Sequence, residues 1–251
     1  MAAKYDQGAM YIDTEKKLIL ERLRDMASQR WSDNEVIGGP EASGSPSNVT
    51  PFTFKHPEDV LRNMTVRQPN STEELLRVLE SAEEEILHRN QQASFPVRIL
   101  IVDSIAAPLK RDFGSNAVPQ RAATAFSIAQ TLKRYAEQLH LAVIVINQVG
   151  LEGGPSASST AAGGWRHDQV AVRAALGTSW HHCVSTRILV DHEVDPHRDG
   201  RQPQYSDDDK TQLRSLNVIK SNWMPSTTIS FEITPVGIVE SSGHHLGDAW
   251  E

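Results

Sequence analysis

Val97-Arg-Ile-Leu-Ile-Val-Asp103 is an apolar run that ends abruptly in a carboxylate. The run is rich in β-branched residues and too short for a helix, so it predicts a strand buried on both faces of a sheet. Open α/β sheets bind their ligands at the carboxyl ends of such strands. Asp103 is therefore the first candidate for a functional side chain.

A helix and a second strand follow in the chain. From Arg121 to His140 the apolar residues recur on one helical face. Leu141-Ala-Val-Ile-Val-Ile146 then predicts another buried strand, which Asn147 and Gln148 close with polar groups. A strand, a crossover helix and a parallel strand, with a polar group after each strand, form half of a nucleotide-binding α/β core.

Four short strings carry a resemblance to a known family. Ile99 to Ser104 resembles the Walker B strand of RecA-type recombinases, and Val143 to Val149 resembles their sensor strand. Asp103 to Pro108 and Ala175 to Trp180 resemble paralogues of the eukaryotic strand-exchange recombinase, of the X-ray repair cross-complementing type. The resemblance implies an α/β RecA-like P-loop NTPase core with a mostly parallel sheet, C-terminal antiparallel strands and an incomplete N-terminal part.

Composition narrows the class of protein. The chain has 251 residues, enough for one α/β domain with a sizeable core. Its formal net charge of −7 argues against a broadly basic surface that coats nucleic acid, although it allows a local basic loop. The single cysteine, Cys183, excludes an internal disulfide. The sequence contains neither an apolar span long enough for a membrane helix nor a signal peptide, so we expect an intracellular protein with no membrane partner. The resemblance implies that the protein is nuclear.

The phosphate loop of the family is missing from this sequence. No Gly-x-x-x-x-Gly-Lys-[Ser/Thr] occurs, although such a loop and its lysine hold the phosphates of ATP in the family. The family places that loop before the strand that Gly8 begins, so we expect a truncated or shortened form of a longer protein. We expect one RecA-like core domain over residues 1–251, with disordered insertions at 32–57 and 192–212.

The resemblance assigns roles at the ends of the predicted strands. Gly8 to Glu15 predicts a short strand with a polar end, and Glu15 matches the carboxylate that orients the attacking water. Asp103 matches the residue that holds the Mg²⁺ of ATP, and Ser104 adjoins it at the nucleotide. The simpler alternatives are that Glu15 belongs to an acidic cap of the next helix and that Asp103 caps the next turn.

Two further positions match nucleotide contacts of the family. Gln148 matches the glutamine that couples the γ-phosphate to a DNA-binding loop, because an amide can bond a phosphate oxygen and a backbone group together. The resemblance therefore makes Glu15, Asp103 and Gln148 the catalytic set, with ATP and Mg²⁺ as cofactors. Ser221-Asn-Trp-Met-Pro225 resembles the segment that caps the nucleotide of an adjacent protomer, which makes Pro225 a nucleotide-binding candidate. A strand-end amide and a hairpin turn with a packed Trp223 are the alternatives.

The positions of the two DNA-binding loops of the family are recognisable. Residues 110–117 match the first loop and 150–174 match the second, although Ser115-Asn-Ala117 replaces the Gly-Arg-Gly centre of the first loop. Basic side chains can meet phosphates and aromatic ones can stack on bases. The candidates are Lys110, Arg111, Phe113, Trp165, Arg166 and Arg173. Plain solvated or flexible loops are the alternative at both places.

Shorter signals predict the remaining elements. Met64 to Arg67 predicts a strand, and Ser71 with Glu74 forms a capping-box signature before a helix. The closing antiparallel strands are predicted at Leu216–Lys220, Thr228–Ile233 and Gly237–Glu240.

The sequence supports competing functions. The first is a mediator or scaffold in homologous-recombination DNA repair, which binds another recombinase-paralogue subunit and single-stranded or junction DNA without hydrolysing ATP alone. The second is a DNA-dependent ATPase, if a longer form carries an upstream phosphate loop. The third is an interaction protein or an unstable product, because loss of an interior strand would leave unpaired backbone beside Val143–Ile146.

Overall fold

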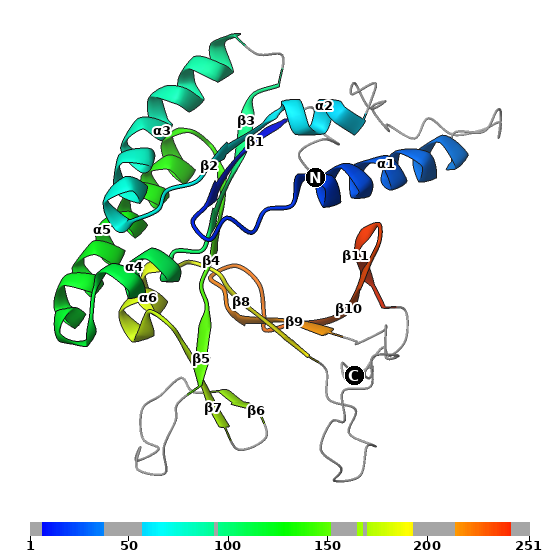
Figure 1. Ribbon diagram of the computed structural model, residues 1–251. Coiled ribbons are helices and arrows are strands. Elements are labelled where there is room, and N and C mark those ends of the chain that lie inside the picture. Colours follow the sequence, from blue (N-terminus) through cyan, green and yellow to red (C-terminus); the bar gives the residue numbers. More distant parts are fainter. Residues whose placement is uncertain are drawn as a thin grey trace, which may run out of the picture. The chain divides into compact units, whose positions relative to one another are not determined.

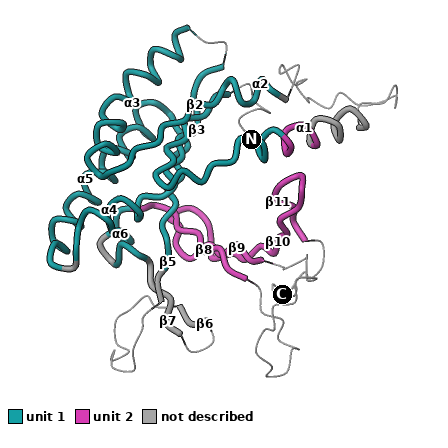
Figure 2. The backbone as a smooth tube through the Cα atoms, viewed as in Figure 1, with its two compact units in different colours: residues 1–24, 39–183 teal, residues 25–38, 184–251 magenta. Residues whose placement is uncertain are grey.

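The computed structural model describes residues 7–37, 57–92, 95–151, 165–167, 170–192 and 214–241. The chain divides into two compact units, where the sequence predicts one domain: residues 1–24 with 39–183, and residues 25–38 with 184–251 (Figure 2). Each unit is built around its own main sheet.

The first unit contains the parallel sheet that the sequence predicts (Figure 1). Its strand order is β2-β1-β3-β4, and every neighbouring pair is parallel. The strands are β1 (Gly8–Asp13), β2 (Met64–Arg67), β3 (Val97–Asp103) and β4 (Ala142–Ile146). The α-helices among the described residues of the whole chain are α1 (Leu20–Ile37), α2 (Pro57–Arg62), α3 (Thr72–Gln92), α4 (Ala106–Asp112), α5 (Val118–Gln138) and α6 (Gly177–Cys183). The α/β fold class is therefore confirmed.

One face of this sheet forms the core, and we call it the covered face. Strand residues alternate between faces, so Met10 and Ile12 of β1 point to the same side as their register partners Leu100 and Val102 of β3, and all four are fully buried. The helices α3 and α5 lie along the sheet (Figure 1) and contribute the other buried side chains, among them Leu75, Leu79, Ile86, Ile128, Leu132 and Tyr135. Burying each of these large side chains contributes roughly 1.5–3 kcal/mol.

The opposite face, the open face, is less buried than predicted. Tyr11 of β1 and Ile101 of β3 share a register position on it and are only half-buried, so β3 is not buried on both faces. β4 is a terminal strand of this sheet whose described partner is β3. Ile144 and Ile146 are 50% and 41% exposed. The strand predicted at 141–146 is thus present, but the prediction that it is buried is wrong. Apolar composition does not indicate how many strands and helices lie beside a strand.

The predicted capping box starts α3. The Glu74 N–H donates to the Ser71 hydroxyl at 3.1 Å, and the Glu74 carboxylate accepts the Asn70 N–H at 2.6 Å. Satisfying the Glu74 donor of the first turn, together with the Asn70 N–H that precedes the helix, explains why the helix begins here. Asp112 at the end of α4 accepts the Thr72 N–H at 2.5 Å and so ties α4 to the start of α3.

Two antiparallel sheets complete the fold. The second unit has the order β11-β10-β9-β8, from β8 (Arg187–His192), β9 (Arg214–Lys220), β10 (Thr228–Thr234) and β11 (Gly237–Glu240), as predicted for the closing strands. The small sheet β5-β7-β6, called the hairpin sheet below, belongs to the first unit. It consists of β5 (Val149–Leu151), β6 (Trp165–His167) and β7 (Val170–Ala174).

Part of each predicted insertion is regular structure. α1 runs to Ile37, so residues 32–37 are helical. Glycine and proline, which end helices, come next only at Gly38 and Pro40. α2 begins at Pro57, and β8 ends at His192. The rest of both predicted insertions lies outside the described residues. Among the described helices, none is both long and apolar enough to cross a membrane.

Candidate functional site

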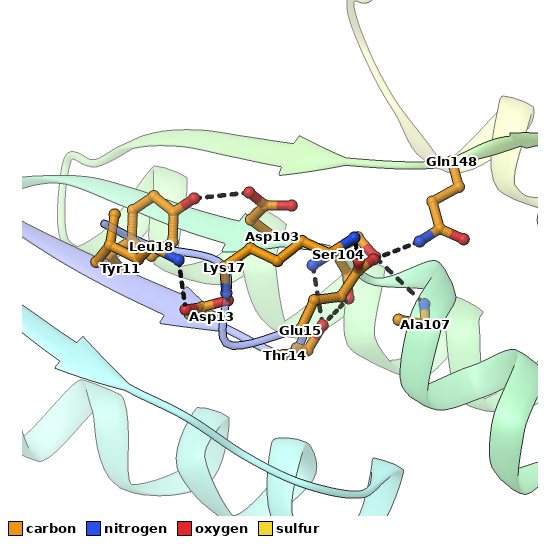
Figure 3. Close-up of polar contacts among 10 residues, drawn as sticks. All are labelled: Tyr11, Asp13, Thr14, Glu15, Lys17, Leu18, Asp103, Ser104, Ala107 and Gln148. Atoms are coloured by element: carbon orange, nitrogen blue, oxygen red, sulfur yellow. Dashed lines mark hydrogen bonds and ion pairs between the residues drawn. The ribbon is translucent and has the colours of Figure 1, made fainter. Parts of the chain in front are cut away.

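The carboxyl ends of β1, β3 and β4 bring distant parts of the sequence together (Figure 3). β1 ends at Asp13, and Thr14 then pins the chain to the end of β3. The Thr14 N–H donates to the Asp103 carbonyl at 2.8 Å, and its hydroxyl donates to the Ser104 carbonyl at 2.7 Å while accepting the Ser104 N–H at 2.9 Å. These bonds place Glu15 beside Ser104.

Glu15 is the centre of what we call the strand-end cluster: Glu15, Lys17, Asp103, Ser104 and Gln148. Its Oε1 accepts the Ser104 hydroxyl at 2.9 Å and also the amide N–H of Gln148, and its Oε2 pairs with the Lys17 ammonium. The Lys17 ammonium first, and then the Ser104 hydroxyl, lower the pKa of Glu15. Glu15 and Gln148, which the resemblance makes catalytic, are thus in direct contact.

Asp103 has a partner that the sequence analysis missed. The Tyr11 hydroxyl, on the open face, donates to Asp103 Oδ2 at 2.6 Å (Figure 3). Burial, followed by this bond to a carboxylate, raises the pKa of Tyr11 far above its usual range. Parallel register between the two strands could have predicted this contact. It puts Asp13 opposite Asp103, and Tyr11 lies two residues before Asp13 on the same face of β1.

A tight turn after β1 directs Lys17 toward Glu15. Lys16 has φ of 56°, the left-handed region that L-residues seldom adopt. Asp13 holds the turn by accepting the N–H groups of Lys17 at 3.2 Å and Leu18 at 3.0 Å. Burial alone raises the pKa of Asp13, but the bonds from Leu18, Lys17 and Gln68 outweigh it, so the pKa is lowered. Asp13 therefore serves as the anchor of the turn.

The first predicted DNA loop is largely helical. Lys110 and Arg111 lie in the last turn of α4, and a 3₁₀ turn at Ser115–Ala117 follows. Arg111 donates to the Asn70 carbonyl and lies 3.5 Å from the Asp112 carboxylate, so its guanidinium is engaged within the chain. Phe113 is half-buried at the end of α4. Of these candidates, exposed Lys110 is the best placed to meet a ligand.

The second predicted loop contains strands. Trp165 and Arg166 belong to β6 and Arg173 to β7, while their side chains lie outside the described residues. The base of the hairpin sheet is tied to the strand-end cluster, because the Ala175 N–H donates to the Gln148 carbonyl at 2.8 Å. The backbone thus connects the second loop region directly to Gln148.

Pro225 belongs to the second unit, in the connection between β9 and β10. The Ser221 hydroxyl accepts the N–H groups of Trp223 and Met224, each at 3.3 Å, which defines the turn. Trp223 is 74% exposed, so the alternative of a packed tryptophan is wrong. Its indole N–H donates to the Thr186 hydroxyl at 3.2 Å and leaves the ring face uncovered.

The strand-end cluster fits only part of an ATP·Mg²⁺ site. Asp103 supplies the hard oxygen ligand that Mg²⁺ prefers. However, the described residues contain no group of three acidic, histidine or cysteine side chains that could hold a metal ion. The Lys17 ammonium is already paired with Glu15, and the sequence lacks the phosphate loop. These residues therefore do not form a triphosphate site by themselves.

Comparisons with known proteins agree with the fold. A family profile described as Rad51 matches residues 50–190. The chain is 26% identical over 160 residues to "DNA repair protein XRCC3 homolog" of Arabidopsis thaliana, covering 59% of this chain and 53% of that protein. It is 25% identical over 250 residues to human "DNA repair protein RAD51 homolog 2", covering 93% of this chain and 54% of that protein. The chain spans about half the length of these curated relatives.

Proposed function

This chain belongs to the Rad51 family, and we propose that it acts in homologous-recombination DNA repair as a mediator or scaffold. In this role it binds another recombinase-like subunit and single-stranded or junction DNA, in the nucleus. The names of its relatives, which are DNA repair proteins, support the process.

The occupied state of Glu15 is the observation that favours a scaffold over a hydrolase. A carboxylate that orients water needs a free oxygen toward the water. Here both carboxylate oxygens of Glu15 accept bonds from this chain's own side chains. With no phosphate loop in the sequence, the isolated chain supplies no grip for a triphosphate.

Nucleotide contact in this proposal occurs at a partner's ATP. The partner supplies the phosphate loop, and this chain presents Gln148, the second loop region and the Ser221–Pro225 turn to the partner's ATP. In that state the Gln148 amide would exchange its bond to Glu15 for one to a phosphate oxygen. When bound, ATP and Mg²⁺ would provide the phosphoryl chemistry. DNA would meet the hairpin sheet with Trp165, Arg166 and Arg173, and α4 with Lys110.

The test measures DNA-stimulated ATP hydrolysis by a purified recombinase-paralogue subunit, with and without this chain. We expect a complex by size-exclusion chromatography and a changed hydrolysis rate. Gln148→Ala should abolish the change, whereas Gln130→Ala, an exposed glutamine on α5, should not. A complex without any change in rate would remove the shared nucleotide site, and no complex with any paralogue would remove the scaffold.

A second candidate is a DNA-dependent ATPase formed by a longer polypeptide. The convergence of Glu15, Asp103 and Gln148 at neighbouring strand ends supports it, because the family's water-orienting and magnesium positions meet in one place. An in-frame Gly-Lys-[Ser/Thr] in the coding sequence upstream of Met1 would favour this enzyme. In that form Glu15→Gln should abolish hydrolysis while ATP binding persists.

A further inference from the structure

A continuous set of contacts leads from Lys17 through Glu15 and Gln148 to the hairpin sheet. We propose that Lys17 and Glu15 are positioning residues that fix the base of the hairpin sheet without a nucleotide. The resemblance gives Gln148 the task of reporting a γ-phosphate, whereas in this chain its amide is bonded to Glu15.

The turn after β1 fixes the first contact. Asp13 accepts two consecutive backbone N–H groups, from Lys17 and Leu18, and Lys16 takes the left-handed conformation. This geometry turns the Lys17 side chain back over the turn, where its ammonium pairs with Glu15 Oε2. The pair is unequal in exposure, since the Lys17 side chain is 76% exposed and that of Glu15 is 16% exposed. The lysine is therefore a solvent-side counterion for a mostly buried carboxylate.

The carboxylate then joins the ends of two strands. Ser104 follows β3, and Gln148 follows β4, and both donate to Glu15 Oε1. A partly buried carboxylate that accepts several donors is held in one orientation, because rotating it would break those hydrogen bonds together. The Glu15 carboxylate thus accepts the amide hydrogen bond that Gln148 would otherwise donate to a phosphate oxygen.

The last contact connects Gln148 to the hairpin sheet. The Gln148 carbonyl accepts the Ala175 N–H at 2.8 Å, and the next residues pair as Val149 with Ala174 and Gly150 with Arg173. The hydrogen bond between Gln148 and Ala175 therefore immediately precedes the pairing of β5 with β7. Fixing its side chain fixes the register at which this sheet leaves the core.

The inference concerns only contacts within this chain, so it does not depend on a partner or on DNA. If the partner assay above fails, the positioning role stands; if the experiment below fails, the scaffold proposal stands.

The test is hydrogen–deuterium exchange of the full chain, read on peptides covering 147–151 and 170–176. Lys17→Met should raise exchange there roughly two- to fivefold, the effect of an exposed ion pair, and Lys17→Arg should restore protection. Glu15→Gln should raise exchange about tenfold, because the amide loses the charge that pairs with Lys17 and keeps only one of the two oxygen acceptors. Lys16→Met, which removes the same charge from the same turn, should leave exchange unchanged.

Three outcomes would overturn the proposal. The first is wild-type protection of these peptides in both Lys17→Met and Glu15→Gln. The second is equal acceleration in peptides of β9 and β10, which would indicate general destabilisation instead. The third is increased protection of the hairpin peptides when ATP and Mg²⁺ are added to the wild-type chain alone. If Glu15→Gln does not fold, Gln148→Leu tests the same link from the other side.

Discussion

The covered and open faces of the first unit's sheet come from the same strands but are stabilised differently. On the covered face, Met10, Ile12, Leu100 and Val102 are fully buried, and α3 and α5 lie along the sheet (Figure 1). On the open face, aliphatic residues stay half-buried or exposed, and the specific contacts are polar and gather at the carboxyl end. Packing of apolar side chains therefore stabilises the covered face of this sheet, whereas hydrogen bonds at the strand ends organise the open face.

The largest expected difference between the faces comes from a matched pair of substitutions. Ile12→Ala, on the covered face, should lower the free energy of unfolding by about 3–4 kcal/mol, because it removes fully buried methyl groups and leaves a cavity. Ile144→Ala, on the open face, should cost about 1 kcal/mol or less, since that side chain is 50% exposed. Urea unfolding of both variants measures this, and equal losses would contradict the distinction.

A second pair compares hydroxyl groups. Tyr11→Phe removes a hydrogen bond to the Asp103 carboxylate and should cost about 1.5–3 kcal/mol, as for bonds to charged groups. Tyr135→Phe, on the covered side, removes a bond to the Leu79 carbonyl and should cost about 1 kcal/mol. The same unfolding measurements apply. A smaller loss for Tyr11→Phe would show that the strand-end contacts contribute less than the packing side.

The pH dependence of stability should come from the strand ends. The pKa values of Glu15 and Asp13 are both lowered in the folded chain, Glu15 mainly by Lys17. A lowered pKa means that these groups stabilise the fold above their unfolded values, about 4, and that this contribution is lost as the pH falls through the folded values. Urea midpoints measured from pH 7 to pH 3 should therefore fall, and less steeply in Lys17→Met than in Lys16→Met.

The smallest expected effect lies where α5, from the covered side, connects to β4. His140 follows the end of α5 with φ of 53°, a conformation that glycine adopts without steric cost. His140→Gly should therefore stabilise the chain by about 0.5–1 kcal/mol, detectable as a higher thermal midpoint. A lower midpoint would mean that the imidazole makes a stabilising contribution larger than the backbone strain.

Local patterns in the sequence predicted the elements but not their surroundings. The aliphatic runs of β3 and β4, the apolar stripe of α5 and the Ser71–Glu74 capping box all form as expected. The prediction that β4 is buried was wrong, because a run of isoleucine and valine indicates a strand without indicating how many strands or helices cover it. The prediction of a loop at residues 110–112 was wrong, because their charged side chains are equally suited to the exposed end of a helix, here α4.

The candidate site was predictable to the extent that topology fixes it. Glu15, Asp103 and Gln148 lie at or just after the carboxyl ends of parallel strands, so their meeting at one edge follows from the strand predictions alone. The resemblance gave Glu15 a role toward water, but its partner Lys17 depends on a single backbone angle at Lys16, which no periodicity reports. Tyr11 was missed because its contact with Asp103 crosses between strands.

The unpaired side of β4 also bears on how this polypeptide behaves in solution. Its outer backbone groups have no partner strand among the described residues, and the neighbouring isoleucines are exposed. An aliphatic edge of this type is a template for other extended chains. Self-association through intermolecular β-pairing is therefore the expected failure at high protein concentration, and dilution should reduce it.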